Sequence, residues 1–166
     1  MKKTTLFLLL SMIWLAAFSQ KIVKNEKDAF TGNQVKETSY VKRSDGLTCS
    51  IRSVNDLRTL MVSFNGGDET YVMEQGAPFM FLLQNDSIVN LSNLEDAVGE
   101  YRSVNVGNTY ISHFLLQTKY FLSGEQIKAL QTLKITKVRF YTTSGYIERE
   151  VSEKNAKKLL KLFNLL

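Results

Sequence analysis

The chain alternates short β-prone segments with tight turn signals, and this pattern constrains its fold more than any other feature. Asp45-Gly46 separates two such segments, and Ser144-Gly145 separates another two near the end of the chain. Dipeptides of this kind between β-branched and aromatic residues are typical of β-hairpins. Strand and helix patterns do not alternate along the chain, so the sequence favours an antiparallel sheet over a parallel one.

The turn signals divide the chain into about seven to nine strands of one antiparallel sheet. Pro78–Leu83 is apolar almost throughout, which indicates a strand buried on both faces. Leu94–Tyr101 has no clear period and is compatible with a short helical turn. Residues 21–31 are expected to form an entry strand or arm. The strands are expected at 35–43, 47–54, 57–64, 70–73, 78–83, 87–91, 109–121, 136–142 and 146–151.

Two helices are expected in the second half of the chain. Ser123 followed by Gln126 forms a capping-box pattern, and Ser152 is placed to cap a final helix. That final helix has an apolar stripe with the helical period, formed by Ala156, Leu159, Leu160 and Phe163. The sequence therefore predicts an α+β fold, a mainly antiparallel sheet with one or two helices near the C-terminus.

Residues 1–19 have the layout of a secretory signal peptide. Two lysines precede an almost unbroken apolar run over residues 6–18, and a small residue, Ser19, follows. The run is shorter than the roughly 20 residues of a membrane-spanning helix. We therefore expect cleavage between Ser19 and Gln20, which leaves a single domain of residues 20–166 without a transmembrane segment.

A single cysteine limits how this domain is stabilised and where it works. Cys49 is the only one, so the chain forms no internal disulfide and has no cysteine for a lipid anchor at the cleavage point. Small secreted eukaryotic domains often depend on disulfides, so a domain stabilised by its core alone favours a bacterial periplasmic or extracellular setting. Cys49 alternates with Leu47 and Ile51, and we expect it to be buried as a small apolar side chain.

The charge distribution argues against a nucleic-acid partner. The chain has 21 Lys and Arg against 16 Asp and Glu. Two of those lysines belong to the expected signal peptide, and the others are dispersed. Nucleic-acid-binding domains concentrate basic residues on one face. The sequence also lacks a glycine-rich phosphate loop, so no nucleic acid and no cofactor are expected.

Few residues offer catalytic or metal-binding chemistry. His113 is the only histidine, and on a strand it shares a face with Ile111 and Leu115, which indicates a partly buried structural side chain. The enzymatic alternative is a Cys49/His113 pair, because a cysteine nucleophile needs a nearby base. One cysteine and one histidine are too few for a zinc site, and no metal is expected.

The carboxylates leave one further catalytic alternative open. Asp68-Glu69 and Glu95-Asp96 lie in expected turns without the alternating acidic pattern of a calcium loop. Glu148 and Glu150 share a strand face with Tyr146, as is common on a solvated sheet surface. A carboxylate pair assembled from distant segments is invisible in sequence, so glycosidic hydrolysis stays an alternative.

Both ends of the chain carry a resemblance. It rests on Ala17-Phe18-Ser19-Gln20-Lys21, Asp28-Ala29-Phe30-Thr31-Gly32, the segment 138–147 and the helix 154–159. These residues resemble small, uncharacterised secreted proteins of Bacteroidota. The resemblance implies a Gram-negative envelope setting, and it brings no catalytic residues with it.

Three functional hypotheses follow. The leading one is a secreted or periplasmic, non-enzymatic module that binds an envelope protein, a peptide or a glycan through one sheet face. The second is a small envelope hydrolase that uses carboxylates or Cys49 with His113. The third is a structural subunit that self-assembles through an exposed sheet edge.

Overall fold

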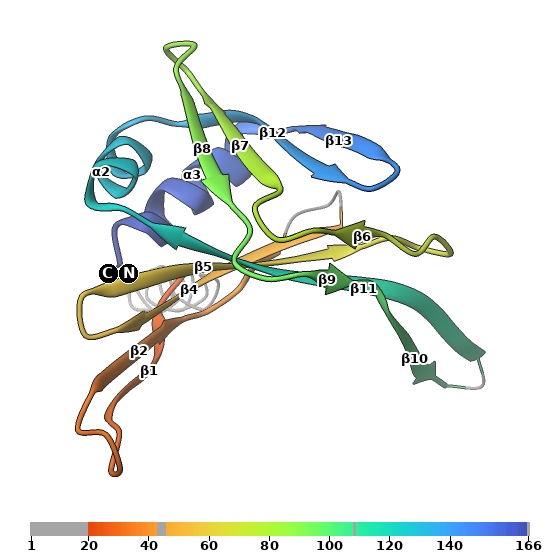
Figure 1. The fold of residues 1–166 in the computed structure, drawn as a ribbon, viewed down its shortest axis with the longest axis horizontal. Helices are drawn as coiled ribbons and strands as arrows, with labels where there is room; N and C mark the ends of the chain where they lie inside the picture. Colours follow the sequence, from red (N-terminus) through yellow and green to blue (C-terminus); the bar gives the residue numbers. More distant parts are fainter. Residues whose placement is uncertain (1–19, 43–45, 108, 166) are drawn as a thin grey trace, which may run out of the picture.

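The computed structural model describes residues 20–42, 46–107 and 109–165. They form antiparallel strands and two α-helices in a layered arrangement (Figure 1). The strands are β1 (Ile22–Lys27), β2 (Gln34–Thr38), β3 (Val41–Lys42), β4 (Leu47–Val54), β5 (Leu57–Asn65), β6 (Val72–Met73), β7 (Pro78–Leu83), β8 (Ile88–Ser92), β9 (Ala97–Val98), β10 (Glu100–Val106), β11 (Thr109–Leu122), β12 (Ile135–Thr142) and β13 (Gly145–Glu150). The helices are α2 (Gly124–Thr132) and α3 (Glu153–Phe163). The predicted signal peptide lies outside the described residues.

The larger layer is a seven-stranded sheet with the order β1-β2-β4-β5-β11-β10, in which β3 also pairs with β4. The segment 35–43, expected as one strand, is interrupted between β2 and β3. At the interruption the Ile51 N–H donates to the Thr38 hydroxyl at 2.8 Å. That side chain satisfies a backbone donor that the broken ladder leaves open.

The second layer is a four-stranded sheet with the order β13-β12-β7-β8, and β6 and β9 form a separate pair. The chain turns at residues 65–68 after β5, but this turn does not lead into a hairpin. β5 already lies between β4 and β11, so β6 pairs with β9 instead. At this turn Gly67 has a φ of +64°, and a Cβ on Gly66 would lie 2.5 Å from the Glu69 carbonyl oxygen. Both positions therefore require glycine.

The core lies between the two sheets, with both helices over the same face of the large sheet (Figure 1). Aromatic side chains from the two sheets pack against one another between the layers, and we call these contacts the aromatic seam. Phe64 of the large sheet contacts Phe140 of the small sheet with ring centroids 5.1 Å apart, and Phe79 contacts Tyr120 at 5.1 Å. Burial raises the pKa of the Tyr120 phenol. Each fully buried aromatic side chain contributes about 1.5–3 kcal/mol of transfer free energy.

Both helix caps are as predicted. Gln126 N–H donates to Ser123 Oγ at 3.3 Å, and the Ser123 N–H donates back to the Gln126 side chain at 2.8 Å. Ser152 caps α3 by accepting from the Asn155 N–H. The stripe predicted for α3 is buried except for Leu160, which is half-exposed. No helix among the described residues is long and apolar enough to cross a bilayer.

Two expectations about the middle of the chain are wrong. In β7 the side chains of Phe79, Phe81 and Leu83 are buried, whereas the alternate residues are half-exposed. The small sheet is covered by the core on one face only, so this apolar strand is not buried on both. Leu94–Tyr101 holds β9 and the start of β10 rather than a helical turn, because the distant strands β6 and β11 provide backbone partners. The predicted α+β class, mainly antiparallel, is confirmed.

Candidate functional site

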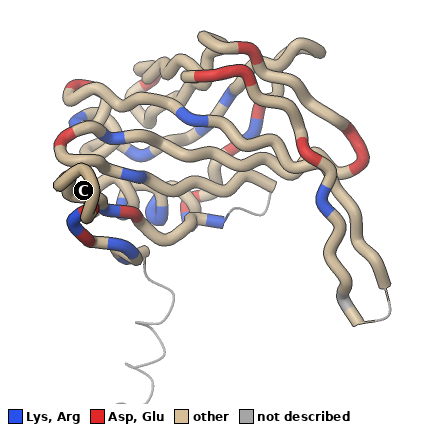
Figure 2. Tube along the Cα trace, turned by 60° about the horizontal axis from the view of Figure 1, so that its bottom comes forward, with Lys and Arg blue, Asp and Glu red and all other residues tan. Residues whose placement is uncertain are grey.

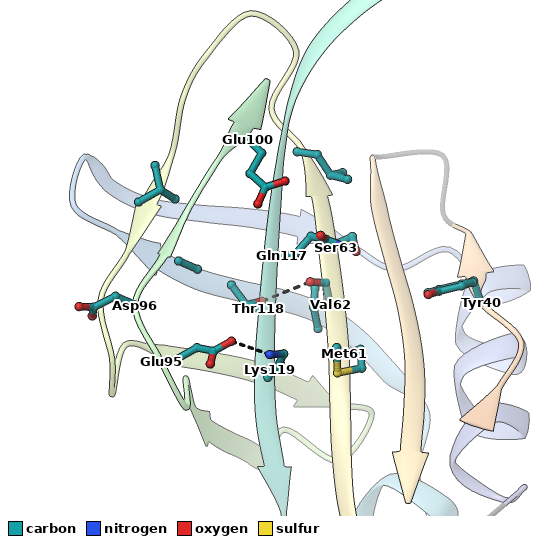
Figure 3. Close-up of a pocket in the computed structure, with 13 residues that line it drawn as sticks. Tyr40, Met61, Val62, Ser63, Glu95, Asp96, Glu100, Gln117, Thr118 and Lys119 are labelled. Atoms are coloured by element: carbon teal, nitrogen blue, oxygen red, sulfur yellow. Dashed lines mark hydrogen bonds and ion pairs between the residues drawn. The ribbon is translucent and has the colours of Figure 1, made fainter. Parts of the chain in front are cut away.

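The outer face of the large sheet, which points away from the core, carries a groove of about 320 Å³. Its floor comes from β5 and β11, where the side chains that alternate with core residues point outward (Figure 3). Ser63 pairs with Gln117 across the two strands, and Met61 pairs with Lys119. The floor therefore presents hydroxyl, amide, thioether and ammonium groups together with the apolar side chain of Leu115.

Two walls border this floor. On one side stands Tyr40, from the break between β2 and β3, with 64% of its surface exposed. On the other side lie Glu95, Asp96 and Glu100, from the segment that runs along β11 (Figure 3). A second hollow of about 210 Å³ lies against the same tyrosine and also shares Met61 with the groove. The two hollows together extend the surface across most of the sheet.

The charges in the groove are largely paired within the protein. Lys119 forms an ion pair with Glu95 at 2.7 Å, and both side chains are about half-exposed. The Gln75 N–H donates to the Asp96 carboxylate at 2.7 Å, and Glu100 pairs with Arg102. Exposed pairs of this kind contribute little to stability. One ammonium against three carboxylates makes the groove unfavourable for an anionic ligand.

The backbone of β5, one of the two strands of the floor, has no groups to offer a ligand. β5 is paired with β4 on one side and with β11 on the other, so its N–H and C=O groups are used within the sheet. A ligand over β5 is therefore recognised by side chains alone. Strand addition, which depends on free backbone groups, takes place at sheet edges and not on such a face.

The outer face of the small sheet places Glu148 in an ion network. Lys137 and Arg139 both contact its carboxylate, and Lys137 also contacts Glu150. Hydrogen bonds from Lys137 and then Arg139 lower the pKa of Glu148. A glycosidase acid needs a raised pKa, so this carboxylate is set for structural pairing. The Arg139 guanidinium also lies 4.7 Å from the centroid of the Tyr146 ring.

The structure does not bring Cys49 and His113 together. Cys49 is 2% exposed and points into the core, as expected for a small apolar residue. His113 is half-buried on β11, and it alternates with the inward-facing Leu116, which places it on the outer face. Cys49 pairs with Val62 on β5, and Val62 pairs with Thr118 on β11. His113 lies five positions before Thr118, so two strand spacings and five residues separate it from Cys49. That separation is about 20 Å, so these residues form no catalytic pair.

Cleavage before Gln20 falls at the limit of the described residues, since Ser19 and the residues before it are not described. Among the described residues, no group of three His, Cys, Asp or Glu side chains is close enough to hold a metal ion. The carboxylates at 68–69 lie in a turn, and those at 95–96 are tied to Lys119 and to backbone.

Comparison with protein-family models, curated proteins and solved structures found no match for this chain. The resemblance to secreted proteins of Bacteroidota therefore stays a prediction.

Sequence reasoning missed the groove residues because they come from distant segments. Tyr40, Met61 and Gln117 are far apart in sequence and meet only through the pairing of β4, β5 and β11. The one local signal is the alternation along 109–121, which correctly separates inward from outward side chains. That alternation does not reveal which outward residues border a hollow.

Proposed function

We propose that this protein is a non-enzymatic binding module of the periplasm or cell exterior, and that the groove on its large sheet binds a glycan. The proposal rests on one observation. The polar side chains of Ser63, Gln117 and Lys119 lie side by side between an exposed tyrosine and a wall of carboxylates. Removal of residues 1–19 would release the domain into that setting.

The chemistry of the floor favours a glycan over a peptide. A peptide laid across β5 finds no free backbone partners there, so its own N–H and C=O groups lose hydrogen bonds to water. Sugar hydroxyls both donate and accept, and they match the hydroxyl, amide and carboxylate groups present here. Tyr40 offers an exposed ring on which the apolar face of a pyranose can stack.

The shape and charge of the groove support the same class of ligand. The carboxylates of the wall disfavour acidic polymers. The groove and the hollow beyond Tyr40 form a path rather than a closed pocket, which suits several sugar units of a chain. A neutral polysaccharide of the cell envelope or its surroundings is the ligand we expect.

The test is binding of the purified protein to arrays of bacterial cell-wall, capsular and plant polysaccharides, with a matching array of peptides. We expect saturable binding to a neutral glycan. Tyr40→Ala should weaken it about tenfold, since a stacked aromatic ring is worth about 1 kcal/mol or more. Gln117→Ala should weaken it through lost hydrogen bonds.

Tyr146→Ala is the matched control, because Tyr146 is 61% exposed, close to the 64% of Tyr40, but lies on the other sheet. It should bind as the unaltered protein does. Binding to peptides alone, or glycan binding that Tyr40→Ala and Gln117→Ala leave intact, would overturn the proposal. Binding to cell-wall polysaccharides only, or to plant polysaccharides only, would support it and identify the source.

A further inference from the structure

The β10–β11 hairpin extends beyond the body of the large sheet as an arm (Figures 1 and 2). β5, the inner neighbour of β11, ends where Asn65 pairs with Leu115, and the Gly66–Gly67 backbone bonds only as far as Phe114. Beyond that point β10 and β11 pair only with each other, from Arg102–His113 to Val106–Thr109. We use "the arm" for residues 102–106 and 109–113.

Beyond Arg102 at its base, the arm carries no acidic or basic side chain of the Asp, Glu, Lys or Arg type, and it combines exposed large apolar side chains with small polar ones. Residues 103–118 contain no Asp, Glu, Lys or Arg. Within this stretch and just before it, large side chains are exposed on both faces of the ribbon, with Tyr110 at 76%. These exposed residues are Tyr101, Val104, Tyr110 and Ile111.

Such an arm is unfavourable for an isolated molecule, because it is weakly stabilised and leaves a strand edge open. A two-stranded hairpin without further packing is marginally stable in water, and an uncharged open edge is a template for pairing with another chain. The opposite edge of the same sheet is protected in the usual way, because β1 carries Lys24, Glu26 and Lys27. Beyond Arg102 the arm lacks such charges, which indicates that another strand covers its edge.

We propose that the arm binds the arm of a second copy of this chain, through antiparallel pairing of the two β10 edges. An uncharged surface is best matched by an uncharged partner, and the arm is itself such a surface. Pairing of identical strands about a two-fold axis is self-complementary and closes after two copies. β10 is the natural contact, since it is the outermost strand of the sheet and no strand among the described residues pairs with its outer side along its seven residues.

The area of the arm sets the strength of this dimer. The arm is five residue pairs long, so it is about 17 Å long and two strands wide, and exposes on the order of 700 Å². Edge pairing covers roughly half of that surface, which is less than the about 800 Å² per partner of a stable interface. We therefore expect a reversible dimer that forms in the micromolar range.

Sedimentation velocity of the purified protein from about 1 to about 300 µM tests the proposal, because that range brackets a micromolar dissociation constant. We expect a concentration-dependent monomer–dimer equilibrium. Val104→Lys should raise the dissociation constant at least about tenfold, since a lysine on an edge strand opposes pairing. In a full-length overlap it would also face Arg102 of the second copy.

Val23→Lys is the matched control. Val23 lies on β1, the other open edge of the same sheet, and is 57% exposed against 51% for Val104. It should leave the dimer unchanged, and equal melting temperatures would show that both variants fold. A strict monomer at every concentration, a dimer that Val104→Lys leaves intact, or a dimer that Val23→Lys disrupts would each overturn the proposal.

Discussion

Asn93 is a buried polar residue whose replacement tests how the two layers are joined. Its side chain is 2% exposed, and its amide nitrogen donates to the carbonyl oxygens of Glu74 and Glu95. Its backbone exchanges hydrogen bonds with the turn at Gly76 and Ala77, at 2.8 and 3.0 Å. One amide thus connects the end of β8 to the turns that flank β6 and β9.

Two replacements of Asn93 distinguish the loss of its side-chain hydrogen bonds from the effect of a buried charge at the same position. Asn93→Ala removes both side-chain bonds, at about 0.5–1.5 kcal/mol each. It also removes Oδ1, which is the one buried side-chain N or O atom among the described residues without a hydrogen-bond partner. That loss offsets part of the cost, so we expect Asn93→Ala to destabilise the protein by about 1–2 kcal/mol.

Asn93→Asp places a carboxylate oxygen against the same two carbonyl oxygens, in a site closed to water. An uncompensated buried charge costs about 3–5 kcal/mol, so this variant should be the less stable of the two at neutral pH. Burial and the carbonyl oxygens should raise the carboxyl pKa above its usual value in the folded state. The penalty is therefore present above that raised pKa and decreases as the pH falls through it.

Urea unfolding of the unaltered protein and both variants at pH 5 and pH 7.5 measures these free energies. The gap between Asn93→Asp and Asn93→Ala should be largest at pH 7.5 and should narrow at pH 5. Comparison with the unaltered protein at each pH removes the contribution of other titrating groups. Equal stabilities of the two variants at both pH values would show that this amide does not donate to the carbonyl oxygens of Glu74 and Glu95.

Two further predictions concern the core and the small sheet. Phe140→Ala should lower the free energy of unfolding in urea by about 3–5 kcal/mol, because it leaves a cavity in the aromatic seam. Phe30→Ala changes a fully exposed side chain and should leave the free energy of unfolding almost unchanged. Equal losses for the two variants would contradict the observed burial. Because Lys137 and Arg139 lower the pKa of Glu148, its pairing stabilises the fold above the ordinary pKa of 4.5 and is lost as the pH falls through the folded value. The melting-temperature advantage over Glu148→Gln should therefore shrink below pH 4.5, and an advantage that persists there would contradict the pairing.

Sequence reasoning succeeded where the signals are local. Ser144-Gly145 and the alternation on either side of it predicted the β12–β13 hairpin, and Ser123 and Ser152 predicted both helix starts. In each case the residues that determine the structure lie within a few positions of one another. A turn dipeptide sets a hairpin, and a cap residue satisfies donors one turn away.

The arrangement of the sheets could not be predicted in the same way. Two separate sheets form because β7 pairs with β12, where Phe79 lies opposite Phe140, and because β11 inserts between β5 and β10. These pairings depend on packing between residues far apart in sequence, for which no local signal exists. The groove depends on the same long-range pairings, so the sequence does not reveal it. The arm, in contrast, is marked in the sequence by residues 103–118, which contain no Asp, Glu, Lys or Arg.

The proposed dimer has a geometric consequence for the proposed glycan site. Antiparallel pairing of identical edge strands is generated by a two-fold axis perpendicular to the sheet, so the outer faces of both copies point the same way. Glu100 lies both in β10 and in the groove wall, which brings the two grooves close to the shared edge. A polysaccharide that reaches both grooves would bind the dimer more tightly than either copy alone, through effective concentration and without any new contact. The uncharged arm, which is unfavourable on a monomer, is then explained by the same function as the groove.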